Sequence, residues 1–151
     1  MTEQHDSPEP ILEVRLLQPD AELPTQAYPG DAGLDLVSAG HYNLYPGDHR
    51  LIRTGIAVRL PYGTAGLVTP RSGQAARNRV TVLNAPGVID QGYTGEIMVN
   101  LINHGDELFR VDPGIRIAQL LIVPVVHPVV IQSHDLGDTA RGARGHGSSG
   151  R

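Results

Sequence analysis

Apolar and polar residues alternate along several short segments, a pattern typical of half-buried β-strands. In residues 11–17, Leu12 and Val14 face one side while Glu13 faces the other. Residues 51–60 alternate in the same way, with arginines on the polar side. The other segments that we expect to form strands are 34–37, 65–69, 80–83, 96–102, 107–111 and 115–123.

Turn-forming residues separate these segments. The chain has 18 Gly and 12 Pro among 151 residues, about a fifth of the total, against about 12% in average proteins. Only residues 72–78, which follow Pro70, have the composition of a short helix. Many short strands with Gly or Pro in the gaps predict an all-β barrel or sandwich rather than a helix bundle.

The two ends of the chain differ from its middle. Residues 1–10 have no apolar periodicity, and we expect a disordered leader. Residues 11–136 are expected to form the β domain. Residues 137–151 have almost no apolar side chain but carry three arginines, among them Arg141, so we expect a flexible arm suited to closing over an anion. A tail without a role is the alternative.

The most apolar stretch of the chain is 120–131. Pro124 and Pro128 lack a backbone N–H, so this stretch cannot be a central strand throughout. We expect it to form a seam between subunits, with a plain core segment as the alternative.

Composition excludes several classes of function. The chain has no Cys, which excludes disulfides, thiolate nucleophiles and Cys-ligated metal sites. All 12 basic residues are Arg, and the absence of Lys excludes a Walker A P-loop and Schiff-base chemistry. The net charge of -4 argues against a nucleic-acid binder. No stretch approaches the ~18 apolar residues of a membrane span, and the acidic start is unlike a signal peptide, so we expect a soluble cytoplasmic protein.

Two loops carry groups suited to phosphate and metal. Asp31 and Asp35 lie at the junction of a loop and a strand, and a carboxylate there can meet hydrated Mg²⁺, which usually takes only one or two carboxylates from a protein. Turn capping is the ordinary alternative. The segment Pro-Arg-Ser-Gly at 70–73 leads into the only predicted helix, where Arg71 and Ser72 suit phosphate oxygens beside the free N–H groups of a helix start. A helix cap with a surface arginine is the alternative there.

A third loop carries groups suited to a nucleoside. Residues 84–97 predict a β-hairpin whose turn is 87–92. Asn84 offers an amide donor and acceptor that suit a nucleobase edge, and Tyr93 could pack on a sugar or a base. Asp90 lies between them and could act as a general base toward water. Ordinary turn residues are the alternative.

Taken in order, five segments resemble the five motifs of the trimeric deoxyuridine triphosphatases (dUTPases). They are Pro-Gly-Asp-Ala-Gly-Leu-Asp-Leu at 29–36, Pro-Arg-Ser-Gly at 70–73, the segment 84–97, Gly-Ile-Arg-Ile-Ala-Gln-Leu at 114–120 and the arm at 141–150. The resemblance runs over nearly the whole chain. Five motifs in register are a far more specific signal than any one of them.

The resemblance implies a homotrimer of jelly-roll-like β subunits. Three active sites would lie at subunit interfaces, each closed by the C-terminal arm of a neighbour. It implies hydrolysis of dUTP to dUMP and diphosphate with Mg²⁺ as cofactor, which lowers dUTP and supplies dUMP for dTMP synthesis. The expected partners are dUTP and further copies of the chain, with no nucleic acid and no membrane.

The resemblance also implies a role for each motif residue. Asp90 would activate the water that attacks the α-phosphorus, and Asp35 would meet Mg²⁺ through water. Tyr93 would pack under the deoxyribose and exclude a 2′-hydroxyl. The phosphates would be held by Arg71, Ser72, Gly73, Gln119 and Arg141, with Gly147 and Ser148 nearby, and deoxyuridine would be read by Asn84, Gly87, Val88, Ile89 and Met98, with His146 stacking on uracil.

The chain departs from the family pattern at two positions. Ile115 stands where an acidic residue usually precedes the arginine of the fourth motif. Arg144 stands in the arm where Gly is usual, and it could add an anion contact.

Other functions on the same fold remain open at this point. One is a dCTP deaminase or a bifunctional relative, but those enzymes carry a catalytic Glu where this chain has Asn100. Another is a dUTP-sensing regulatory trimer, which could dispense with Asp90, although this chain has it. A β-rich structural oligomer would leave the five motifs unexplained.

Overall fold

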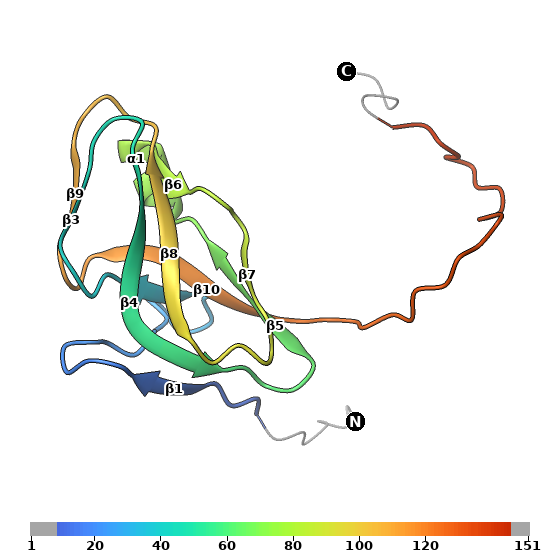
Figure 1. Ribbon diagram of the computed structural model, residues 1–151, viewed down its shortest axis with the longest axis horizontal. Helices are drawn as coiled ribbons and strands as arrows, with labels where there is room; N and C mark the ends of the chain where they lie inside the picture. The colour runs from blue at the N-terminus through green and yellow to red at the C-terminus, as the bar shows by residue number, and fades with distance from the viewer. Residues whose placement is uncertain (1–8, 146–151) are drawn as a thin grey trace.

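A computed structural model describes residues 9–145. The expected all-β fold is confirmed: the described chain consists of short antiparallel strands and one short helix (Figure 1). In chain order the elements are β1 (Glu13–Leu16), β2 (Leu34–Val37), β3 (Tyr42–Leu44), β4 (His49–Arg59), β5 (Thr64–Thr69), α1 (Ser72–Asn78), β6 (Val80–Val82), β7 (Gly87–Ile89), β8 (Glu96–Asn103), β9 (Phe109–Val111) and β10 (Arg116–Pro124).

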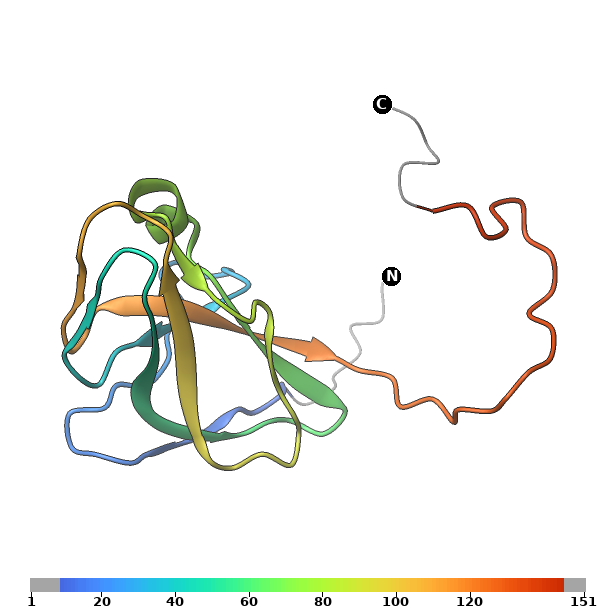
Figure 2. The same ribbon diagram turned by 45° about the horizontal axis from the view of Figure 1, so that its top comes forward.

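The strands form two four-stranded sheets and one small ribbon. The first sheet has the order β1-β4-β8-β6, the second has the order β2-β10-β5-β7, and β3 pairs with β9. In both views β10 runs across the direction of β4 and β8 (Figures 1 and 2). The two sheets therefore cross, and each presents one face to a shared interior.

That interior is aliphatic, in a chain of which only 4% of the residues are aromatic. Leu36, Ile52, Val99 and Leu120 come from both sheets and are at most 1% exposed. Burying a side chain of this size stabilises the fold by about 1.5–3 kcal/mol, so packing between the sheets is a main source of stability.

The helix prediction is confirmed over Ser72–Asn78. The helix ends where Arg79 adopts a left-handed conformation with φ 54° and donates its N–H to Ala75 O. No residue of the helix is buried, so the helix lies on the surface. The Pro-Arg-Ser-Gly segment forms its start, with Arg71 as the N-cap and Ser72 as the first helical residue.

The predicted hairpin over 84–97 is wrong. β7 pairs with β5 in the second sheet, whereas β8 pairs with β4 and β6 in the first. Residues 90–95 therefore form a crossing loop between sheets. An alternating pattern identifies a strand but does not say which sheet the strand joins. The sequence therefore could not distinguish a hairpin from a crossing between sheets. β3 and β7, of three residues each, are absent from the expected strands.

The chain leaves the β domain after β10, which ends at Pro124 as the prolines of the apolar stretch predict. Residues 125–145 run away from the sheets in an extended course (Figures 1 and 2). Val126, Val129 and Val130 are 87–91% exposed. Within residues 9–145, no helix is long and apolar enough to cross a membrane.

Asn103 is a buried polar residue that ties the end of β8 to two neighbouring segments. Its Nδ2 donates to Leu44 O at 2.9 Å and to Glu107 O at 2.8 Å, and its Oδ1 accepts the Gly105 N–H at 2.8 Å. The side chain is fully buried, so each backbone group that it pairs loses its partner if the amide is removed.

We expect Asn103→Leu to lower the free energy of unfolding by about 3 kcal/mol, because it leaves the buried Leu44 carbonyl and two part-buried backbone groups, at Gly105 and Glu107, without their partner. Denaturant unfolding at a fixed protein concentration measures the change. Asn43→Leu, on the exposed face of β3, is the matched control and should stay within about 0.5 kcal/mol of the parent. Equal midpoints for the two variants would contradict the prediction.

Candidate active site

The predicted site residues gather in two cavities of the β domain. The first, which we call the Asn84 cavity, has a volume of about 340 Å³. The second, the Arg71 cavity, has a volume of about 370 Å³. The two have no lining residue in common.

The Asn84 cavity lies where the crossing loop meets the first sheet. Its lining includes the expected general base and, apart from His146, the residues expected to contact the nucleoside: Asn84, Gly87, Val88, Ile89, Asp90, Tyr93 and Met98. Leu51, Val68 and Val82 add apolar wall. An apolar cleft with a few convergent amides suits a flat, polar ring system.

Strand pairing explains how distant residues reach this cavity. Gly87 is the register partner of Val68 on β5, and Met98 is the partner of Arg53 on β4, next to Leu51 and Asn100, which pair with each other. The cavity is thus bounded by both sheets, and the crossing loop joins them.

Asn100 also lines the Asn84 cavity. Its Oδ1 is buried and has no hydrogen-bond partner among the residues that the structure describes. A buried acceptor without a partner is unfavourable, so this oxygen is available to a ligand or a water molecule. An amide cannot exchange protons as a carboxyl group does, so Asn100 does not replace the glutamate of a deaminase.

Asp90 and Tyr93 are held in one tight turn of the crossing loop. The Tyr93 N–H donates to Asp90 O at 3.0 Å. The loop is fastened to the turn after β4, because the Gly63 N–H donates to Oε1 of Gln91 at 2.7 Å. Asp90 is exposed, so its carboxylate is accessible to water and to a ligand in the cavity.

The Arg71 cavity gathers the first, second and fourth motifs. Gln119 on β10 is the register partner of both Asp35 on β2 and Thr69 on β5. This pairing brings Asp35 and the Pro-Arg-Ser-Gly segment to either side of β10. The lining includes Asp31, Gly33, Asp35, Arg71, Ser72, Gly73, Arg77 and Gln119.

Asp35 is the electrostatic centre of this cavity. Its carboxylate lies 3.1 Å from Arg71 Nε and 3.4 Å from Arg116 Nη1, and its side chain is 13% exposed. A carboxylate between two guanidinium groups holds both in place, and Arg71 is thereby oriented before any ligand arrives. Asp31 instead accepts the Tyr28 N–H at 3.0 Å. Asp31 thus caps a turn, the alternative to a metal-binding role that the sequence left open.

Gln119 is held by close packing. Its Nε2 donates to Pro70 O at 3.2 Å. A Cβ at residue 33 would collide with the Gln119 amide, so only glycine there leaves the amide where it is. The second N–H of this amide remains available to a phosphate oxygen.

Sequence reasoning missed Arg77. Its guanidinium reaches back over Gly73, where an added Cβ would lie 2.9 Å from Arg77 Nη2, and it lines the Arg71 cavity. Residues four apart share a helix face, and this spacing from Gly73 was the signal available in the sequence. Arg71 and Arg77 together make the cavity attractive to anions.

Arg141, which is expected to help close the site, lines neither cavity. Arg141 is exposed, and its Nε donates to Arg144 O at 3.1 Å. The described part of the arm runs away from the β domain (Figure 2). His146, Gly147 and Ser148 lie outside the described residues.

Residues 9–145 contain no cluster of three or more His, Cys, Asp or Glu able to hold a metal ion by themselves. The Arg71 cavity therefore does not suit a metal caged by protein alone. It does suit Mg²⁺ that is bound mainly by phosphate oxygens and touches one carboxylate through water, the usual arrangement for Mg²⁺ on nucleotides.

The family model and the related sequences that match this chain all belong to one family. The dUTPase family model matches residues 19–150. The deoxyuridine 5′-triphosphate nucleotidohydrolase of Clostridium tetani is 47% identical over 140 residues, covering 93% of this chain and 97% of the relative. The enzyme of the same description from Thermobifida fusca is 49% identical over 140 residues, covering 92% and 78%.

Solved structures agree with the sequence matches. The dUTPase of Staphylococcus bacteriophage 80alpha with dUpNHpp superimposes with a TM-score of 0.87 at 32% identity, covering 93% of this chain and 99% of that one. A mutant dUTPase from phage phi11 of S. aureus, described as showing the coordination of a structural Mg(II) ion, gives a TM-score of 0.78 at 30% identity, covering 83% and 98%. With the family model, the relatives and the fold all in agreement over most of its length, the chain belongs to the dUTPase family.

Proposed function

We propose that the protein is a dUTP diphosphatase, which hydrolyses dUTP to dUMP and diphosphate. The observation that carries the proposal is the Asn84 cavity, because an amide for a base edge, a tyrosine ring for a sugar and an exposed carboxylate for a water molecule line the same cleft. The product would supply dUMP for dTMP synthesis, and the reaction would lower dUTP.

In this reaction Asn84 and the backbone of 87–89 and Met98 read deoxyuridine. Tyr93 lies against the deoxyribose, where a 2′-hydroxyl would collide with its ring. Asp90 accepts a proton from the water that attacks the α-phosphorus, and a positioned base of this kind is worth about 10²–10⁴-fold in rate.

The Arg71 cavity supplies the phosphate contacts. Arg71, held by Asp35, donates to phosphate oxygens together with Ser72, the Gly73 N–H and the Gln119 amide. Phosphoryl transfer depends mainly on positioning and charge stabilisation. Mg²⁺ bound to the substrate phosphates would add positive charge, and Asp35 would meet it through water.

A homotrimer is part of the proposal. The base-reading and phosphate-holding groups of one chain lie in cavities without a common lining residue, yet one nucleotide needs both. A neighbouring copy that faces the Asn84 cavity with its own Arg71 cavity would complete the site. The exposed valines of 125–131 supply apolar surface for such contacts, and the arm of 137–151 would close over the site of a neighbour.

The experiment that tests the function incubates the purified protein with dUTP, dCTP or UTP and Mg²⁺ and separates the products by chromatography. We expect dUMP and diphosphate from dUTP alone, and a loss of at least roughly tenfold in rate when EDTA removes the metal. Consumption of dCTP would instead favour the deaminase, and dUTP binding without turnover would favour a sensor.

A further inference from the structure

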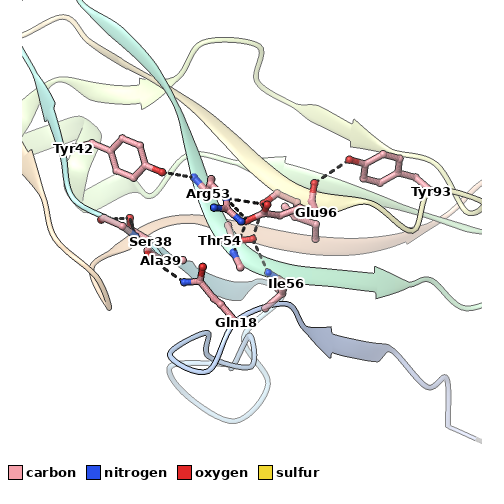
Figure 3. Close-up of polar contacts among 12 residues, drawn as sticks. Gln18, Ser38, Ala39, Tyr42, Arg53, Thr54, Ile56, Tyr93 and Glu96 are labelled. Atoms are coloured by element: carbon pink, nitrogen blue, oxygen red, sulfur yellow. Dashed lines mark hydrogen bonds and ion pairs between the residues drawn. The ribbon is translucent and has the colours of Figure 1, made fainter.

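Tyr93 is anchored by hydrogen bonds at its backbone and at its phenol. Its backbone N–H closes the turn to Asp90 O. Its phenol donates to Glu96 O at 2.9 Å (Figure 3). The ring therefore folds back over residue 95. Tyr93 is 47% exposed, but these two hydrogen bonds fix the orientation of its side chain.

Gly95 provides the space that this ring occupies. A Cβ added there would lie 2.6 Å from the Tyr93 phenol oxygen, 2.7 Å from Cζ and 3.0 Å from Cε2. Carbon atoms pack best at about 3.5–4.0 Å, so the rigid ring would have to move by about 1 Å. Gly95 has no left-handed φ, so its backbone accepts alanine and the strain falls on the ring.

Glu96 fixes the other end of the contact. Its carboxylate accepts Arg53 Nε at 3.0 and 3.2 Å and the Gly55 N–H at 2.9 Å (Figure 3). These bonds tie the start of β8 to the irregular part of β4, where the register shifts between Arg53 and Ala57. The carbonyl that receives the Tyr93 phenol is therefore held by the sheet and not by the loop.

We propose that Gly95 is a specificity-determining position that acts through Tyr93: the bare backbone at 95 and the anchored Glu96 carbonyl together set where the ring stands. The distinction between deoxyribose and ribose then depends on a residue that contacts neither sugar. The inference rests on the proposed hydrolysis of dUTP and on the role of Tyr93 in it.

The test compares Gly95→Ala with Gly92→Ala. Gly92 lies in the same loop, has open space at its Cβ position and no left-handed φ, so it is the matched control. The measured quantity is the ratio of kcat/KM for dUTP to kcat/KM for UTP. We expect Gly95→Ala to lower this ratio roughly tenfold or more, while Gly92→Ala stays within about twofold of the parent.

A second pair of variants separates positioning of the ring from general damage. In a Tyr93→Ala background, adding Gly95→Ala should change the ratio by less than about twofold, since there is no ring to displace. An unchanged ratio in Gly95→Ala, or an equal loss in both backgrounds, would overturn the inference. A parent protein that does not hydrolyse dUTP would instead overturn the proposed function.

Discussion

Asp90→Asn is expected to lower kcat for dUTP by roughly 10²–10⁴-fold, the usual contribution of a positioned general base. The amide has the shape of the carboxyl group but cannot take a proton from water. The backbone bond from Tyr93 to Asp90 O does not involve the side chain, so the crossing loop keeps its form. Steady-state kinetics with dUTP and Mg²⁺ measure the loss.

Two further measurements make this result specific to the reaction. The affinity for dUTP, from calorimetry with the variant, should stay within about threefold of the parent, because binding energy comes mostly from the base and phosphate contacts. Asp20→Asn, at an exposed position outside both cavities, should keep full activity. If Asp90→Asn turned over dUTP near the parental rate, the attacking water would be activated elsewhere.

The parts of the site that sequence could predict are those held within one short segment. Asp90 and Tyr93 belong to one turn, so their joint placement follows from local chain geometry. Arg71 and Ser72 lie at the start of a helix that the sequence predicts. Arg77 was accessible by the same reasoning, through its spacing from Gly73, but a lone arginine on a surface helix carries no further signal.

What the sequence could not predict depends on which strands pair. Asp35 reaches Arg71 and Arg116 only because β2 and β5 flank β10, and a period of two residues does not encode sheet order. The same limit explains the wrong hairpin, because nothing in the sequence shows that β7 and β8 join different sheets. The collision between residue 95 and the Tyr93 ring depends on the conformation of the loop, which no spacing rule gives.

Removing residues 141–151 is expected to lower kcat/KM for dUTP by roughly 10²-fold or more, because the site loses an arginine for the phosphates and the cover that excludes water. The β domain should fold as before, since the chain leaves it after Pro124 and the described arm runs away from it. Thermal melting and light scattering of the truncated protein should therefore match the parent.

Two single substitutions in the arm show which of its arginines contributes to activity. Arg141→Ala should account for a large share of the loss. Arg144→Gly restores the residue usual in the family and should keep or raise activity, because glycine widens the range of backbone conformations open to the arm. The comparison is matched, since both arginines are exposed and each pairs with the other's backbone carbonyl. A fully active truncated protein would show that the arm has no part in the reaction. A loss on Arg144→Gly as large as that on Arg141→Ala would show instead that Arg144 has become an anion contact of its own.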